Sequence, residues 1–438
     1  MKVLLIGSGG REHTLGWALA HSPQSPDILS MPGNPGLAEL GTCLAGDPAQ
    51  HEDVIEAVRQ HDVELVIIGP EAPLVGGLGD ALRGALGQAG VRVFGPSAAA
   101  AALEGSKVFA KDLMHEHGIP TAGYHVVGSA EEARVLLDQI EYPHVFKADG
   151  LAGGKGALII ESREQAAEAV ETLMVARAFG TAGDRVVFEE YLEGEEMSVF
   201  AVASGEQYVL MPPSQDYKRA RDGDQGGNTG GMGAYAPVVR WNPALEANVR
   251  RKVIEPTLHA MAARGTPYNG LLYAGLMVVG DEPRVVEFNC RFGDPETQVV
   301  LPVAGGDLLD LLWKASDPDC REGLPACEHG GRTAVCVVVA SEGYPGRPRT
   351  GGVISGIAEA RGLEDVLVFH AGTRRQGPDL IASGGRVLGV VGVGDDLPRA
   401  RERAYEGVGR IRFDGAFHRG DIAWRGMEAL GESLSPRS

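Results

Sequence analysis

The stretch VVEFNCRFGDPE, residues 285–296, decides how the rest of the chain is interpreted. It follows an apolar run and a turn containing glycine and proline, a pattern that predicts a β-hairpin whose second strand covers 284–288. Side chains alternate between strand faces, so Glu287 and Asn289 point the same way and Arg291 can follow them. Carboxylate and amide oxygens suit Mg²⁺, and a guanidinium suits a planar anion. Alone, the pattern also fits a solvated edge strand.

Composition narrows the class of protein. The 438 residues are enough for two to four domains, and 44% hydrophobic residues are enough for buried cores. A net charge of −19 argues against nucleic-acid binding, and no apolar stretch approaches the length of a membrane span. Five cysteines without a disulfide or metal-binding spacing indicate reduced thiols and predict a cytoplasmic location.

Lysine is uncommon in this chain, since only eight of the 40 basic residues are lysine. A lysine in glycine-rich surroundings is therefore a candidate for a position that needs a compact ammonium group. The lysines in such surroundings are Lys107, Lys147, Lys155 and Lys218.

The chain begins with an apolar run and the sequence GSGGREH, residues 7–13, which predicts a strand, a glycine turn and a helix. Amides at such a helix start can hold a phosphate. A dinucleotide site would have a third glycine near Glu12 and an acidic residue after the second strand, and neither is present. Nicotinamide binding is therefore disfavoured, whereas a monophosphate site and a purely structural turn both stay open. Further apolar strands at 65–68 and 91–94 end in Gly-Pro turns, and the alternation with helices predicts a doubly wound parallel sheet.

A glycine-rich segment, ADGLAGGKG at 148–156, lies between predicted strands at 145–147 and 157–160. It is not a P-loop, because Gly156 stands where Ser or Thr must follow the lysine and because no helix follows. A hairpin flap carrying an ammonium group can close over the β- and γ-phosphates of a nucleotide. A mobile hairpin tip is the alternative, but it does not explain two lysines flanking the glycines.

Three later segments carry further predictions about the nucleotide site, a loop and the C-terminal domain. A strand at 186–192 can present backbone groups to an adenine edge, with a following carboxylate for ribose, although such an acidic run is often a solvated turn. The segment 222–235 lacks apolar periodicity, which predicts a long loop that is either disordered or closes over a substrate. Predicted strands after residue 335 and a helix at 398–407 form a small α+β domain in which only Gly384-Gly385-Arg386 draws attention. A helix is also expected at 131–139 and another at 245–261.

Taken together and in this order, the motifs resemble the ATP-grasp ligases and, within them, the phosphoribosylamine–glycine ligase family. The motifs are GSGGREH, MPGNPG, GPEAPL, LEGSK, KADGLAGGKG, EEYLEGEE, SQDYKR, NTGGMGAY, LYAGLM, EFNCRFGDPETQ and SGGRVLGV. They run nearly from end to end of the chain.

The resemblance implies an α/β fold: an N-terminal doubly wound parallel-sheet domain, an ATP-grasp domain in two subdomains and a small α+β C-terminal domain. The implied boundaries are 1–103 for the substrate-binding domain, 104–122 with 194–325 for the larger ATP-grasp subdomain, 123–193 for the flap subdomain, 326–428 for the C-terminal domain and 429–438 for a tail. The implied reaction joins glycine to 5-phosphoribosylamine with ATP, through glycyl phosphate, to give glycinamide ribonucleotide, ADP and phosphate. Mg²⁺ or Mn²⁺ is the implied metal, and neighbouring purine-pathway enzymes are possible partners.

The resemblance also implies roles for individual residues. The implied ATP-binding residues are Lys107, Lys147, Gly150, Gly153, Gly154, Lys155 and Gly156, with Glu189, Glu190, Tyr191 and Leu192 for adenine and Glu196 for ribose. The implied metal ligands are Glu287 and Asn289, and the implied catalytic residues are Arg291, Lys155 and Asp216, the last of which takes the glycine ammonium group. The implied substrate-binding residues are Gly9, Gly10, Arg11, Gly33, Asn34, Gly69, Pro70, Glu71, Asp216, Lys218, Asn228 and Arg291.

Two alternatives remain at this stage. Another ATP-grasp enzyme, such as a carboxylase or an amino-acid ligase, would keep the ATP apparatus and change the acceptor, and MPGN, GPEAPL and SQDYKR argue against it. A nicotinamide-dependent oxidoreductase or a plain nucleotide-binding module is suggested only by the first glycine turn.

Overall fold

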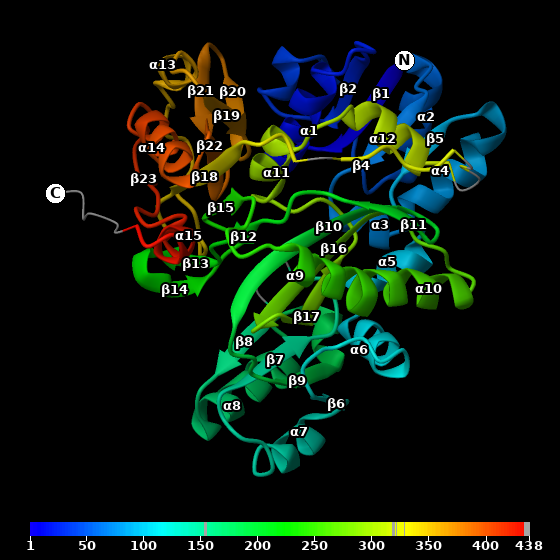
Figure 1. Cartoon of the computed structure of the whole chain (residues 1–438), viewed down its shortest axis with the longest axis vertical. Helices are drawn as coiled ribbons and strands as arrows, with labels where there is room; N and C mark the ends of the chain where they lie inside the picture. Colours follow the sequence, from blue (N-terminus) through cyan, green and yellow to red (C-terminus); the bar gives the residue numbers. More distant parts are fainter. Residues whose placement is uncertain (153–155, 318–319, 321, 328, 433–438) are drawn as a thin grey trace.

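The computed structural model describes residues 1–152, 156–317, 320, 322–327 and 329–432 (Figure 1). The chain forms an N-terminal parallel sheet, a central antiparallel sheet, a small lobe that carries the flap hairpin, and a C-terminal sheet. The α/β architecture expected from the sequence is confirmed.

The N-terminal sheet is entirely parallel in the order β3-β2-β1-β4-β5. Its strands are β1 (Lys2–Gly7), β2 (Asp27–Pro32), β3 (Thr42–Cys43), β4 (Leu65–Ile68) and β5 (Arg92–Phe94). Its main helices are α1 (Gly10–Ala20), α2 (His51–His61), α3 (Glu71–Val75) and α4 (Leu78–Leu86). The strand order reverses between β1 and β4, and the crevice beyond the carboxyl ends of such strands is where open α/β sheets bind ligands. The turns at 7–11 and 69–71 both lie there.

Two consecutive helices, α5 (Ala98–Gly105) and α6 (Lys107–Glu116), connect this sheet to the flap lobe. The lobe contains β6 (Tyr124–Val127), α7 (Ala130–Leu136), β7 (His144–Ala148), β8 (Ala157–Ile160), α8 (Arg163–Val170) and β9 (Val186–Glu190), with sheet order β6-β9-β7-β8. The predicted flap hairpin is confirmed as β7 and β8. The predicted helix at 131–139 is too long: α7 ends at Leu136, and the chain then turns toward β7, with the hydroxyl of Tyr142 donating to the carbonyl of Leu137.

The central sheet has the antiparallel order β11-β10-β16-β17. Its strands are β10 (Glu195–Ser204), β11 (Gln207–Leu210), β16 (Asn269–Val279) and β17 (Glu282–Asn289). The hairpin predicted around the 280–283 turn is thus confirmed, with a bulge: Gly275 faces Glu287 whereas Leu276 faces Val285. The predicted helix at 245–261 is α9 (Pro243–Val249) and α10 (Glu255–Ala263), joined by a π-helical turn over Arg250–Ile254.

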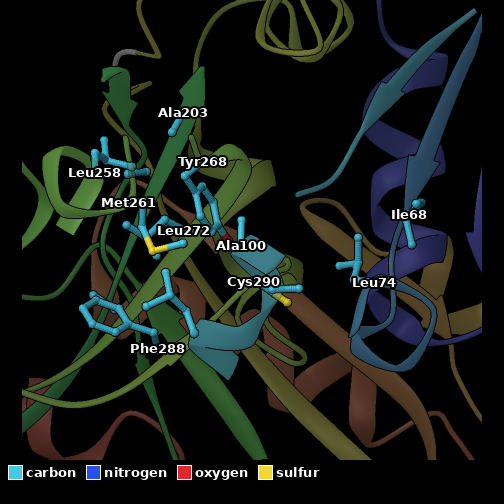
Figure 2. Close-up of a cluster of buried hydrophobic side chains, with 14 of the residues drawn as sticks. Ile68, Leu74, Ala100, Ala203, Leu258, Met261, Tyr268, Leu272, Phe288 and Cys290 are labelled. Carbon is cyan, nitrogen blue, oxygen red and sulfur yellow. The ribbon is translucent and has the colours of Figure 1, made fainter. Parts of the chain in front are cut away.

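A continuous apolar core joins the first sheet to the central sheet (Figure 2). Ala100 of α5, Met261 of α10, Leu272 of β16 and Phe288 of β17 are all buried in it. The strand that carries Glu287 therefore packs against α5 through buried apolar side chains.

The C-terminal sheet takes two strands from the middle of the chain, in the order β12-β15-β18-β22-β19. Its strands are β12 (Gln215–Asp216), β15 (Gly233–Ala236), β18 (Thr333–Ser341), β22 (Arg386–Gly394) and β19 (Val366–His370), and β23 (Ala416–Phe417) adds to β18. The remaining elements after residue 290 are α11 (Thr297–Val303), α12 (Leu308–Ala315), α13 (Ile357–Arg361), β20 (Thr373–Gln376), β21 (Asp379–Ala382), α14 (Leu397–Val408) and α15 (Trp424–Ala429).

The prediction of a long loop at 222–235 is therefore wrong. The segment contains β14 (Gln225–Asn228), which pairs with β13 (Arg219–Arg221), and then β15, which is buried throughout. Both β14 and β15 are only four residues long and contain glycine, which is depleted in strands, so the sequence of the segment resembles a loop.

Candidate active site

One cavity brings together many, though fewer than half, of the predicted site residues. It lies between α5, α6, the base of the flap hairpin, β9, the β12–β15 region and β17. The predicted residues that line it are Glu71, Lys107, Gly150, Gly156, Glu189, Asp216, Lys218, Asn228, Glu287, Asn289 and Arg291. Gly153, Gly154 and Lys155 lie outside the described residues. Residues that line it but were not predicted include Glu104, Lys111, Tyr273, Asp294 and Glu296.

Two buried lysines share one carboxylate where α6 meets β7 and β9. The Lys147 ammonium is 3.0 Å from Glu189 Oε2 and also donates to the carbonyl of Val286 at 2.8 Å. Lys111 is 3.1 Å from the same oxygen and donates to Thr121 Oγ1. Burial lowers the pKa of Lys111 to about 8, although Glu189 opposes the shift. Lys111 lies four residues after Lys107 and on the same face of α6, and this spacing is the sequence signal that could have identified it.

The base of the flap is tied to the start of α6. Asp149 Oδ1 accepts hydrogen bonds from Ser106 Oγ at 2.9 Å and from the amide of Val108 at 3.2 Å, and Lys107 Nζ donates to the carbonyl of Gly150 at 3.0 Å. Gly150 has φ of 154°, and a Cβ there would lie 2.8 Å from Ala182 Cβ. Only glycine fits this position, which sets the direction in which the flap leaves β7.

The residues predicted to bind a divalent metal lie on β17, and both face the cavity. Burial would raise the pKa of Glu287, but Lys218, Lys147 and Lys107 together hold it below its ordinary value, so this carboxylate is ionised. No group of three or more His, Cys, Asp or Glu suited to a metal ion occurs in the described part of the chain. One carboxylate and one amide oxygen nevertheless fit Mg²⁺, which commonly completes its shell with water and substrate phosphates.

Asp216 and Lys218 also line the cavity, and the charge of each affects the pKa of the other. Asp216 is buried, and burial raises its pKa to about 8, with Lys218 opposing and Glu196 adding to the shift. Its Oδ1 has no hydrogen-bond partner among the described residues. Lys218 pairs with Glu196, and Glu196 and Asp216 raise the Lys218 pKa although burial would lower it. Glu196, the expected ribose ligand, is therefore held by Lys218.

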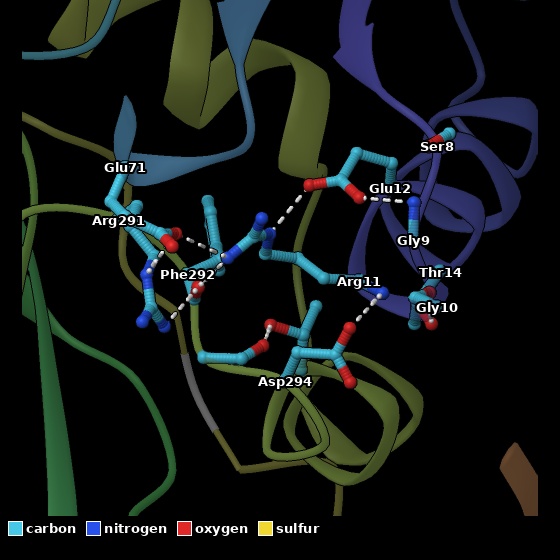
Figure 3. A network of polar contacts seen from close by, with 12 residues as sticks. Ser8, Gly9, Gly10, Arg11, Glu12, Thr14, Glu71, Arg291, Phe292 and Asp294 are labelled. Atoms are coloured by element: carbon cyan, nitrogen blue, oxygen red, sulfur yellow. Dashed lines mark hydrogen bonds and ion pairs between the residues drawn. The ribbon is translucent and has the colours of Figure 1, made fainter. Parts of the chain in front are cut away.

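An arginine pair connects the cavity to the first sheet (Figure 3). Glu71 Oε2 lies 3.3 Å from Arg291 Nε and 4.0 Å from Arg11 Nη1. Both arginines also donate to the carbonyl of Phe292, at 3.2 Å from Arg291 and 3.0 Å from Arg11. The second nitrogen arm of Arg291 is 3.3 Å from Glu104 Oε1. The loops of the N-terminal sheet and the end of β17 thus form one polar network.

The predicted loops of the N-terminal sheet meet around Glu12. Glu12 Oε2 accepts from the amide of Gly9 at 2.6 Å, and Glu12 Oε1 lies 2.2 Å from where a Cβ on Gly69 would be. The side chain of Asn34 donates to the carbonyls of Ser8 and Gly9 and accepts from two amides. Pro70 precedes α3, and Gly33 adopts φ of 73°. These residues hold the loops together, and the Asn34 amide is already used by the protein.

Comparison with known proteins agrees with this geometry. Family models described as phosphoribosylglycinamide synthetase match residues 1–104 (N domain), 105–297 (ATP-grasp domain) and 334–425 (C domain). A phosphoribosylamine–glycine ligase of Rhodopirellula baltica is 45% identical over 427 residues, covering 96% of this chain and 97% of its own length. The chain belongs to the phosphoribosylamine–glycine ligase family.

Other relatives of this family extend the comparison. A phosphoribosylamine–glycine ligase of Chlorobaculum tepidum is 46% identical over 434 residues, covering 98% of this chain and all of its own. The crystal structure of the Thermotoga maritima phosphoribosylamine–glycine ligase superposes with a TM-score of 0.81 at 35% identity, covering 96% of this chain and all of that one.

More distant structures share the fold alone. A biotin carboxylase domain of Hydrogenobacter thermophilus, solved with MgADP and bicarbonate, has a TM-score of 0.70 at 16% identity and covers 95% of this chain and 91% of its own. Within the described residues, we find no helix with the length and apolar character to cross a membrane.

Proposed function

We propose that this protein joins glycine to 5-phosphoribosylamine in purine biosynthesis, converting ATP to ADP and phosphate. The observation that carries the proposal is the Arg11–Glu71–Arg291 network, which connects a cavity with nucleotide-binding features to the loops at the carboxyl ends of β1 and β4. A second substrate held by those loops would meet the nucleotide at Arg291. The family relationship supports the same substrates.

The first step that we propose is attack of a glycine carboxylate oxygen on the γ-phosphorus. The new O–P bond forms as the bond to the β–γ bridging oxygen breaks, which gives glycyl phosphate and ADP. Lys107, Lys147 and the flap Lys155 would hold the phosphates, and Arg291 would face the developing negative charge. Because little covalent chemistry is needed from the protein, positioning and charge neutralisation supply most of the catalysis.

Glu287 and Asn289 would hold Mg²⁺ or Mn²⁺. The fit rests on the ionised state of Glu287 and on the pairing of a carboxylate with an amide oxygen in one cavity. When bound, such an ion supplies charge neutralisation for phosphate oxygens.

In the second step, the amine of phosphoribosylamine would attack the carbonyl carbon of glycyl phosphate. The C–N bond forms, phosphate leaves with the electron pair of the C–O bond, and the amine loses a proton to give the amide. Asp216 would bind the glycine ammonium group through Oδ1, a buried acceptor that has no hydrogen-bond donor among the described residues. Because burial raises the pKa of Asp216, its carboxyl group tends to keep its proton. A bound ammonium group stabilises the ionised carboxylate and would therefore favour release of that proton.

The adenine edge would be read by backbone groups at 189–192. The strand β9 ends at Glu190, whose amide still donates to the carbonyl of Gly123, so the backbone of Tyr191 and Leu192 continues outside the sheet. Glu196 would accept a hydrogen bond from a ribose hydroxyl while it remains paired with Lys218. Lys218 and Asn228 lie where the two substrates would meet, and Asn228 Nδ2 donates to the carbonyl of Ala157 at the flap base at 3.4 Å.

Phosphoribosylamine would be held by the loops at 9–11, 33–34 and 69–71. Since the Asn34 side chain is occupied, we assign it to fixing the loops and leave recognition to backbone amides and Arg11. We also propose the boundaries 1–103, 104–122 with 194–325, 123–193, 326–428 and 429–438, a cytoplasmic location, and contact with neighbouring purine-pathway enzymes.

The test is phosphate release measured with ATP, glycine and freshly prepared phosphoribosylamine, and with each omitted in turn. Full release should require all three. Glu71→Gln should raise the KM for phosphoribosylamine, whereas Glu56→Gln, an exposed change on α2, is the matched control. Full turnover with bicarbonate or D-alanine in place of glycine would overturn the proposal in favour of another ATP-grasp activity.

A further inference from the structure

Tyr217 separates the two site residues Asp216 and Lys218 and points away from them. Both neighbours line the cavity, whereas Tyr217 is fully buried in the apolar cluster of the C-terminal sheet, with Val335 and Leu397. Side chains in extended backbone alternate between faces. The backbone is extended here, because Tyr217 donates to the carbonyl of Gly233 at 2.9 Å and accepts from the amide of Met232 at 2.8 Å.

The ring of Tyr217 lies against two guanidinium groups. The Cζ atoms of Arg419 and Arg425 are 5.2 and 5.1 Å from its centroid, within the range of cation–π attraction. The hydroxyl also accepts from the backbone amide of Arg425 at 3.3 Å. A purely apolar core position would need none of these contacts.

The two arginines are themselves held in place. Arg419 has no exposed surface, and it donates to both oxygens of Asp421, each at 2.7 Å. Its remaining arm reaches Asp224 Oδ1 at 2.9 Å and the carbonyl of Arg219 at 3.0 Å. Arg425 pairs with the other oxygen of Asp224. Asp224 lies in the turn between β13 and β14, so the hairpin that follows Lys218 is tied to residues 419–425 through its first strand and its turn.

We propose that Tyr217, Arg419 and Arg425, which we call the Tyr217 clamp, position Asp216 and Lys218 for glycine. The inference rests on the proposed function of those two residues. Rotation of the backbone at Tyr217 would move both neighbours together, since each is one residue away. Displacement of a substrate-positioning group by about 1 Å is enough to cost up to roughly 10²-fold in rate. The C-terminal residues of the clamp would thus set the geometry of a site that they do not touch.

The test compares Tyr217→Leu, which removes the ring, with Tyr217→Phe, which keeps it. In the full-length protein, Tyr217→Leu should raise the KM for glycine at least about tenfold. ATP affinity measured by calorimetry should change less than about threefold, because Lys107 and Lys147 are untouched and Glu196 is placed by β10 as well as by its pairing with Lys218. Tyr217→Phe should stay within about threefold of wild type, because it keeps the cation–π contacts.

Val408→Ala is the matched control. Val408 is buried in the same apolar cluster, so its truncation lowers stability without altering the Tyr217 clamp. A merely structural role for Tyr217 predicts that both truncations reduce the active fraction and the melting temperature while leaving the KM for glycine unchanged. If Tyr217→Leu leaves this KM within twofold, or if Val408→Ala raises it equally, the inference is overturned.

Arg425→Met carries the same test if Tyr217→Leu does not fold, because the Arg425 side chain is only partly buried. It should raise the KM for glycine at least about threefold and leave ATP affinity unchanged, since it removes one of two guanidinium contacts. Unchanged KM in this variant would again reject the clamp. Failure of the proposed function is seen separately, as wild-type turnover that does not depend on glycine.

Discussion

Replacement of Glu189 by glutamine should strongly destabilise the flap lobe. The carboxylate is buried and serves as the shared counter-ion of Lys111 at 3.1 Å and Lys147 at 3.0 Å. Glutamine keeps the shape and removes the charge, so two buried ammonium groups lose their partner. Removing one member of a buried ion pair costs about 3–5 kcal/mol. Lys111 limits the cost to this range, because its pKa is already near 8 and it can release its proton when Glu189 is gone.

Native-state hydrogen exchange measures the loss of stability in the flap lobe separately from the rest of the protein. A loss of about 3–5 kcal/mol should accelerate the slowest amides of β7 and β9 roughly 10²- to 4 × 10³-fold, since tenfold corresponds to about 1.4 kcal/mol. Amides of β1 and β4 in the same molecules are the internal control. Adding Lys111→Met should restore at least half of the lost protection, because a neutral group then replaces an unpaired charge. Exchange in β7 and β9 within threefold of wild type for Glu189→Gln would refute the reasoning.

Three other outcomes are expected. Burial places the pKa of Lys111 at about 8 against an ordinary 10.5, so between these values the unfolded chain binds more protons and the free energy of unfolding rises with pH. Lys111→Met should remove this increase in the free energy of unfolding with pH. Urea titrations at several pH values between about 8 and 10.5 measure it, and an equal increase in the variant would contradict the assignment to Lys111. Glu287→Gln should slow turnover greatly and leave the circular dichroism spectrum unchanged, and near-normal activity at saturating Mg²⁺ would contradict the metal assignment. Lys155→Ala should lower kcat, measured by a coupled assay, more than it lowers ATP affinity, measured by calorimetry. Lys147→Ala should weaken ATP binding itself. If Lys155→Ala instead lowers ATP affinity and leaves kcat unchanged, the flap contributes to ATP binding and not to the chemical step.

The parts of the fold that could be predicted from sequence are those whose pattern is local. The run at 65–68 is β4, and the hairpin around the flap has the expected strands, because apolar runs bounded by glycine indicate strands directly. The segment 222–235 was misread because β15 acquires its strand conformation from pairing with β18, far along the chain. Nor does the pattern at 131–139 indicate that α7 ends at Leu136, because local periodicity does not fix the last residues of a helix.

For the candidate site, motifs located the residues but not their partners. Glu287, Asn289 and Arg291 were expected together and do line one cavity. The sequence could not reveal that Glu71 would join Arg11 to Arg291, because these contacts depend on how two sheets pack. Nor could the sequence show that the hydrogen-bonding groups of the Asn34 side chain would be occupied by contacts within the loops. Pairings of this kind are set by tertiary structure, whereas composition and spacing report only which chemistry is available.

The C-terminal sheet also has a consequence for how the protein is made. β15 lies between β12 and β18, and Gly233 pairs with Val337. On a ribosome that adds about 5–20 residues per second, the partner strand emerges roughly 5–20 s after β15. During that interval the nascent chain presents an open strand edge, which is a template for mispairing with another chain. Asp216 and Lys218 therefore reach their places only after β18 has emerged, and polypeptides released early would contain Lys107 and Lys147 without the completed wall of the cavity that Asp216 and Lys218 form.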